Sequence, residues 1–294
     1  MEIDLIVVPY HLGHARVGPG LGPERLLAAG AEQALLVAEH PSTVTPVEIA
    51  EEQSNEIGSL MAVNRQVARR VRQTVAGGSL PLVLSGNCNA SIGTVGGLET
   101  STLGIVWFDA HGDYETPETT PSGLFDGMIL SVLTGDCWTT LRTGISSAPP
   151  IAKQRILNVG ARTIEGGERE RIEASSLVVL DPERFRQGDG SSFRQALATL
   201  SQQVDGIYLH VDMDVLDPSE GAANNWAAPG GLSLAELEAA IALVGEMLPI
   251  QAAGVASYDP TIDTDGRVAR AGVRVIAAIA RAVDAPRPIA AGSR

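Results

Sequence analysis

The feature that most restricts the fold of this chain is the acidic end of two apolar runs. The first run ends at Asp109, His111 and Asp113, and the second ends at Asp212 and Asp214. Side chains two apart on a strand point the same way, so both sets can converge on one point. Buried carboxylates repel one another and are costly to desolvate unless cations neutralise them. The pattern therefore predicts two strand ends gathered around a pair of bound metal ions.

Short runs rich in β-branched residues alternate with amphipathic stretches, which is typical of parallel strands joined by helices. Helices are expected at Glu56–Ala76 and at Ser233–Met247, where Ser233 and Glu236 have capping-box spacing. Eight strands are predicted, at Ile3–Pro9, Thr45–Ile49, Leu80–Leu84, Gly104–Phe108, Arg155–Val159, Leu177–Leu180, Gly206–Asp212 and Ala252–Ser257.

The chain shows no Pro-rich or Ser-rich linker, no long charge block and no repeat of fixed period. Residues 1–294 are therefore predicted to form one domain, with a frayed tail after Ile279. Glycine-rich loops follow several predicted strands, and ligands of open α/β sheets bind beyond the carboxyl ends of strands. Both acidic clusters occupy such ends.

Composition excludes several classes of function. The chain has 21 basic and 35 acidic residues, a formal charge of −14, which disfavours nucleic acids and anionic membrane surfaces as partners. No apolar run approaches the roughly 20 residues that a membrane span needs. Cys88 and Cys137 make no disulfide framework, and the chain begins directly with a strand-like segment. We therefore expect a cytoplasmic protein that acts on a small molecule.

A third predicted strand ends in a glycine turn that leads to Cys88. A thiolate there would be a sixth metal ligand, although a free cysteine is often only a small buried hydrophobe. The six donors would suffice for two ions about 3.5–4 Å apart that share bridging carboxylates. Such a pair lowers the pKa of a bridging water to near neutrality.

The order of these motifs resembles the ureohydrolases, the family of arginase, agmatinase and formiminoglutamase. The resemblance covers nearly the whole chain. It rests on the glycine turn before Cys88, on Asp109–Asp113, and on the later Asp212–Asp217 with Pro218 and Gly230–Leu232. The segments Val8–His14, Gly20–Leu27 and Thr116–Gly123 extend it.

The resemblance implies a three-layer αβα sandwich with an eight-stranded parallel sheet, two Mn²⁺ ions, and urea-releasing hydrolysis of a guanidine or amidine C–N bond. It also implies a homo-oligomer, a trimer or a hexamer. One metal ion would bind Cys88, Asp109, Asp113 and Asp212, and the other would bind Asp109, His111, Asp212 and Asp214.

Several positions depart from the family pattern. Cys88 replaces a histidine ligand, and its soft sulfur makes Zn²⁺ or Fe²⁺ an alternative to Mn²⁺, which the four carboxylates favour. Asp126 stands where arginases have the histidine thought to shuttle protons. Glu115 replaces an asparagine that helps to bind the substrate carboxylate, which it would repel. Asp126 and Glu115 are the candidate catalytic side chains.

Substrate contacts are predicted at Ser122, Trp226, Ser257 and Asp259. Ser257 corresponds to the glutamate that holds the guanidinium in arginases, so a charge-assisted clamp is missing. Glu115, Asp126 or Asp259 would have to supply a replacement anion for a cationic substrate. A less basic derivative such as N-hydroxyarginine fits the loss of the glutamate better than arginine does.

Two other functions compete with this hypothesis. A catalytically silent ureohydrolase-like protein with a binding or structural role would explain the lost histidine ligand, proton shuttle and clamp. The five carboxylate and imidazole ligands that survive favour the hydrolase. A metallophosphatase would need basic groups for phosphate, and the strand-end loops offer few besides Arg16 and Arg162.

Overall fold

The fold is built on one eight-stranded sheet in which every pair of neighbouring strands is parallel. The computed structural model describes residues 1–49, 55–164 and 166–286. The strand order is β4-β1-β5-β10-β9-β6-β7-β8. The strands are β1 (Ile3–Val8), β4 (Ser42–Pro46), β5 (Leu80–Ser85), β6 (Leu103–Phe108), β7 (Ile156–Val159), β8 (Val178–Leu180), β9 (Gly206–Asp212) and β10 (Ile250–Ala256).

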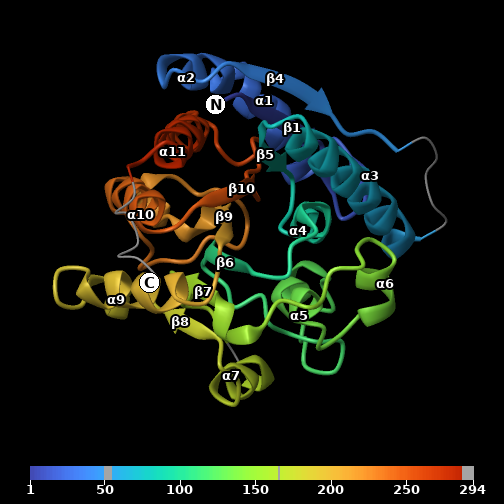
Figure 1. The fold of residues 1–294 in the computed structure, drawn as a ribbon, viewed down its shortest axis with the longest axis vertical. Coiled ribbons are helices and arrows are strands. Elements are labelled where there is room, and N and C mark those ends of the chain that lie inside the picture. Colours follow the sequence, from blue (N-terminus) through green and yellow to red (C-terminus); the bar gives the residue numbers. More distant parts are fainter. Residues whose placement is uncertain (50–54, 165, 287–294) are drawn as a thin grey trace, which may run out of the picture.

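Helices cover both faces of this sheet, which confirms the predicted sandwich (Figure 1). One layer contains α3 (Glu56–Ala76), α4 (Ala90–Leu98) and α5 (Ile129–Thr134), and the other contains α1 (Gly22–Ala28), α2 (Ala31–Val37), α9 (Ser191–Ser201), α10 (Leu234–Met247) and α11 (Arg267–Val283). Helices α6 (Thr139–Thr143) and α7 (Gly166–Glu173) lie at the periphery, and α8 (Pro182–Arg186) packs against α9 and β8.

Local sequence signals account for several element boundaries. Helix α3 has the predicted limits, and the side chain of Asn55 caps its first turn by accepting from Gly58 N. At the start of α10, Ser233 and Glu236 form the predicted capping box. Such caps satisfy N–H groups that the helix itself cannot pair.

The edges of the fold differ from prediction. Strand β4 spans Ser42–Pro46 rather than Thr45–Ile49, because its register is set by pairing with β1 at one edge of the sheet. Strand β10 begins at Ile250, two residues earlier than predicted. A small hairpin of β2 (Tyr10–His11) and β3 (His14–Ala15) was not predicted.

The predicted frayed tail is wrong for its first residues. Helix α11 continues through Ala280 to Val283, and it does so because Ala280, Ala282 and Val283 are buried in the core. Residues 287–294 of the tail lie outside the described residues. Among the described residues, no helix combines the length and the apolar character that a membrane crossing requires.

The sheet order brings the candidate residues to one edge. Strands β5, β10, β9, β6 and β7 are consecutive in the sheet. Their carboxyl ends lead into Cys88, Ser257, Asp212, Asp109 and the segment before α7. Because parallel strands end on the same side, these groups surround one depression in the molecule.

Candidate metal centre

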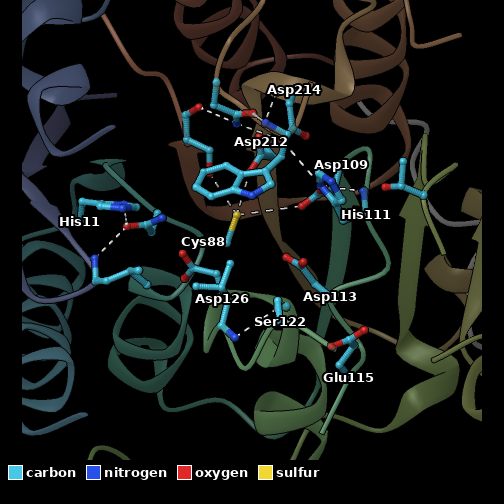
Figure 2. A pocket seen from close by; sticks show the side chains of 18 of the residues that line it. His11, Cys88, Asp109, His111, Asp113, Glu115, Ser122, Asp126, Asp212 and Asp214 are labelled. Atoms are coloured by element: carbon cyan, nitrogen blue, oxygen red, sulfur yellow. Dashed lines mark hydrogen bonds and ion pairs between the residues drawn. The ribbon is translucent and has the colours of Figure 1, made fainter. Parts of the chain in front are cut away.

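Asp109 is the central carboxylate of the site. It follows β6 directly and is 1% exposed. Its Oδ1 accepts from His111 N at 2.8 Å and lies 3.1 Å from His111 Nδ1, while its Oδ2 accepts from Trp107 Nε1 at 3.0 Å. These donors fix the carboxylate between the two halves of the cluster (Figure 2).

The first half, the His111 half, comprises Asp109, His111 and Asp214, whose potential ligand atoms lie within 4.8 Å of one another. Asp214 Oδ2 lies 3.6 Å from His111 Nδ1 and accepts from Asn224 Nδ2 at 3.0 Å. Burial opposes a charge on His111, but the hydrogen bond with Asp109 and the charges of Asp214 and Asp109 raise its pKa to about 9. The metal-free protein therefore holds an imidazolium here.

The second half, the Cys88 half, comprises Cys88, Asp113 and Asp212. The Cys88 sulfur lies 2.9 Å from Asp212 Oδ2, 3.9 Å from Asp109 Oδ2 and 3.2 Å from His210 Nε2. Burial and the neighbouring carboxylates raise the pKa of Cys88 well above its ordinary value. Burial and the charges of Asp214 and Asp109 do the same for Asp212. Without a cation, this half therefore retains protons.

Asp113 provides the clearest sign of a missing partner. Its buried Oδ2 has no hydrogen-bond partner among the described residues. Burial and the charges of Asp109 and Asp212 raise its pKa well above the usual range. The residue also has a φ of 49°, a left-handed conformation that is uncommon outside glycine and concentrates at functional sites. A carboxylate oxygen held in this way fits a cation ligand, so the donor set suits divalent metal ions.

The cluster forms the floor of a cavity of about 200 Å³. Seven acidic side chains line it, and none of the described lining residues is Lys or Arg. Arg162 instead donates to backbone carbonyls, including Asp214 O at 2.9 Å, and Arg16 pairs with Glu24. A phosphate group would find no basic side chain among the described lining residues, which argues against a phosphate site. The acidic lining residues are Asp109, Asp113, Glu115, Asp126, Glu168, Asp212 and Asp214.

Asp126 lies in the cavity wall and is held by Asn89. Its Oδ1 accepts from Asn89 N at 3.1 Å and from Asn89 Nδ2 at 2.9 Å. Burial raises the pKa of Asp126 to about 6, although these hydrogen bonds oppose the shift. A carboxyl group with such a pKa can exchange protons near neutral pH.

The other predicted residues lie at different depths. Glu115, Ser122 and Trp226 line the cavity, with Ser122 exposed at its rim and Trp226 42% exposed. Ser257 is buried, with its Oγ 3.5 Å from the Cys88 sulfur. Asp259 is not among the residues that line the cavity, and its Oδ1 accepts from Thr261 N and Thr261 Oγ1. The structure therefore brings together all the predicted site residues except Asp259.

Sequence reasoning missed Glu168. This residue lies in the first turn of α7, lines the cavity and is 4% exposed. Its Oε1 accepts from Tyr114 N at 2.8 Å, and burial raises its pKa to about 7. The only local signal was an acidic residue in a glycine-rich segment after a strand. Its proximity to Asp113 depends on β7 being the neighbour of β6.

This chain is similar to known proteins over nearly its whole length. A family model described as the arginase family matches residues 1–281. Arginase from Bacillus subtilis (strain 168) is 30% identical over 285 residues, which cover 93% of this chain and 96% of that protein. A crystal structure of arginase from Bacillus subtilis has a TM-score of 0.88 at 29% identity and covers 95% of this chain and 98% of its own.

A more distant structure shares the fold. Formimidoylglutamase from Bacillus subtilis has a TM-score of 0.79 at 20% identity, covering 97% of this chain and 88% of its own. The match to the family model over nearly the full length, together with the identity to arginase, settles the relationship: this chain belongs to the arginase family.

Proposed function

We propose that this arginase-family enzyme is a binuclear metal-dependent amidinohydrolase that prefers N-hydroxyarginine to arginine. The observation that carries the proposal is the buried acid cluster on the cavity floor, with Asp113 Oδ2 unpartnered among the described residues. The cavity of about 200 Å³ is smaller than sites for drug-sized ligands and suits a substrate the size of an amino acid.

Two divalent cations would occupy the cluster. Cys88, Asp109, Asp113 and Asp212 would hold one, and Asp109, His111, Asp212 and Asp214 would hold the other. When bound, such ions neutralise the carboxylates and make water a better nucleophile. The four carboxylates support Mn²⁺ as the first choice, and the Cys88 sulfur supports Zn²⁺ or Fe²⁺ as alternatives.

Asp126 is the proposed proton carrier. Asn89 occupies its Oδ1, so Oδ2 is the oxygen left to hold or release a proton. Its pKa of about 6 lies close enough to neutrality for both protonation states to be accessible. The departing amine would take its proton from this oxygen.

Recognition of the guanidino group is expected to differ from that of an arginase. Ser257 presents a neutral hydroxyl beside Cys88 where the resemblance places a glutamate. When a charged partner is missing, a less basic hydroxyguanidine loses less binding free energy than a guanidinium does. Glu115, at the cavity wall, would repel the substrate carboxylate and would face a cationic group of the substrate, with Ser122 and Trp226 at the rim.

Steady-state turnover of arginine, N-hydroxyarginine, agmatine and guanidino acids by the purified, metal-loaded protein tests this proposal. We measure kcat/KM from release of the amine product, and we expect the highest value with N-hydroxyarginine. Fastest turnover of arginine would contradict the proposed preference. No turnover of any substrate by protein with two bound metal ions per chain would favour the catalytically silent alternative.

The Ser257→Glu variant provides a matched control. A charge-assisted hydrogen bond contributes about 1.5–3 kcal/mol, so the ratio of kcat/KM should shift toward arginine by roughly 10–100-fold. An unchanged ratio would show that position 257 does not select the substrate.

Assembly and location are further proposals. Family resemblance supports a trimer or hexamer in the cytoplasm. Sedimentation velocity of the metal-loaded protein tests the assembly, and a monomer at all concentrations would refute it.

A further inference from the structure

His210 occupies a slot built by three neighbouring strands. It lies on β9 two residues before Asp212, is 1% exposed, and pairs in register with Trp107 of β6 and Gly254 of β10. Its ring stacks on the Trp107 indole, with centroids 3.6 Å apart and planes at 18°. A Cβ at Gly254 would clash with the Tyr208 hydroxyl and would lie 3.5 Å from His210 Nδ1. The glycine therefore leaves room for this ring and its partners.

The two ring nitrogens face different chemistry. Nδ1 lies 3.0 Å from the Tyr208 hydroxyl and 3.2 Å from Ser91 Oγ, and these two hydroxyls are 2.8 Å apart. Nε2 lies 3.2 Å from the Cys88 sulfur. His210 is not among the residues that line the cavity, whereas Cys88 is. The imidazole therefore sits behind the sulfur.

The hydrogen bonds of Cys88 must change when a cation binds. In the metal-free protein the thiol proton can be donated to Asp212 Oδ2 at 2.9 Å. If Cys88 held a cation it would do so as a thiolate, which can only accept hydrogen bonds. His210 Nε2 at 3.2 Å is then the nearest donor, since Ser257 Oγ is at 3.5 Å. With Nε2 donating, Nδ1 accepts from a hydroxyl, and Tyr208 and Ser91 supply one.

We propose that His210 is a positioning residue that donates its Nε2–H to the Cys88 sulfur and so orients the sulfur toward the metal site. This rests on the proposed metal-dependent function. Groups behind a ligand orient it and tune the metal, and their loss typically costs about 10–100-fold in metal affinity. The role belongs to this chain's own pairing of a cysteine on β5 with a histidine on β9.

Cobalt binding separates this role from simple packing. The protein is stripped of metal and titrated with Co²⁺, while thiolate-to-cobalt charge transfer is followed in the near ultraviolet. In His210→Phe the ring still stacks on Trp107 but donates nothing. Its charge-transfer band should move to longer wavelength, and its Co²⁺ affinity should fall about 10–100-fold. His210→Gln restores an N–H near the Nε2 position, so its band and affinity should stay close to the wild-type values.

A second variant tests the same chain of hydrogen bonds by removing only one of the two hydroxyl partners of His210. Tyr208→Phe leaves Ser91 as the partner of Nδ1, so its band should shift in the same direction as that of His210→Phe, but less. Circular dichroism of each metal-free variant checks that the fold is kept.

Three results would overturn the proposal: a wild-type protein without a charge-transfer band, a His210→Phe band and affinity equal to wild type, or a His210→Gln variant as impaired as His210→Phe. Failure of the proposed function has a different signature. A protein that shows the band and its shift but turns over no guanidino substrate would keep the His210 role and lose the enzymatic one.

Discussion

The two halves of the metal centre balance their charge by different means. In the His111 half, Asp109 and Asp214 face an imidazole whose pKa is raised to about 9, and Asn224 donates to Asp214. In the Cys88 half, the sulfur contacts Asp212, a buried histidine and the neutral hydroxyl of Ser257, and Asp113 Oδ2 has no partner among the described residues. The His111 half contains a positively charged imidazole, and the acidic groups of the Cys88 half retain protons.

The difference follows from the cost of burying charge. A buried carboxylate keeps its charge only where an opposite charge or several donors compensate for lost hydration. The His111 half meets that condition within the protein, so it is preorganised. The Cys88 half meets it only when a cation arrives, so it should control how strongly metal binding depends on pH and how much it stabilises the fold.

The largest effect is expected from removing one ligand in each half. Asp113→Asn and His111→Asn should each reduce the metal content from two ions to one per chain. Because changes behind a ligand already cost about 10–100-fold, turnover should fall by more than about 100-fold in both variants. Elemental analysis and steady-state kinetics measure this. Two retained ions in either variant would remove that residue from the ligand set.

The same two variants should have opposite effects on the metal-free protein. His111→Asn leaves Asp109 and Asp214 without their counter-charge and should lower the free energy of unfolding by about 3 kcal/mol. Asp113→Asn removes a carboxyl group whose pKa is raised by burial and by the charges of Asp109 and Asp212, and should increase that free energy. Urea unfolding in the presence of a chelator measures both, and effects of the same sign would break the comparison.

The buried carboxyl group of Glu168 should make the stability of the metal-free protein depend on pH. Burial raises its pKa from 4.5 to about 7, so the folded state holds this proton more tightly than the unfolded state. Its contribution to stability is complete below pH 4.5 and is lost as the pH rises to about 7. The loss should reach at most about 3 kcal/mol. Urea unfolding of the metal-free protein from pH 4 to 8 measures it, and Glu168→Gln, the matched control, should flatten the curve. An equally steep curve for the variant would rule this group out as the cause.

The smallest effect is expected behind the His111 half. Asn224→Ala removes the donor to Asp214 Oδ2 but leaves His111 in place. Affinity for one of the two ions should fall by about tenfold, the lower end of the range for such contacts. Calorimetric metal titration resolves the two sites. Equal weakening of both would mean that the halves are not independent.

Local pattern was enough for part of this architecture. The two apolar runs were correctly predicted as β6 and β9, but β6 ends at Phe108 and Asp214 lies in a 3-10 helix, Met213–Val215. The turns after the strands, rather than the period of two along them, therefore place most of the acidic set. Helix α3 and the capped start of α10 were also predicted from sequence, because periodicity and capping act within a few residues. The limits of the edge strand β4 were not predicted correctly, because its pairing with β1 determines them.

The sequence by itself determined that acids end two buried strands and that a cysteine and a serine replace residues expected from the family. Only the tertiary structure decided that Glu168 reaches the cavity, that Asp259 does not, and that His210 contacts the Cys88 sulfur from outside the cavity. The reason is that strand order brings together residues more than a hundred positions apart, such as Cys88 and His210, and no short-range pattern encodes that order.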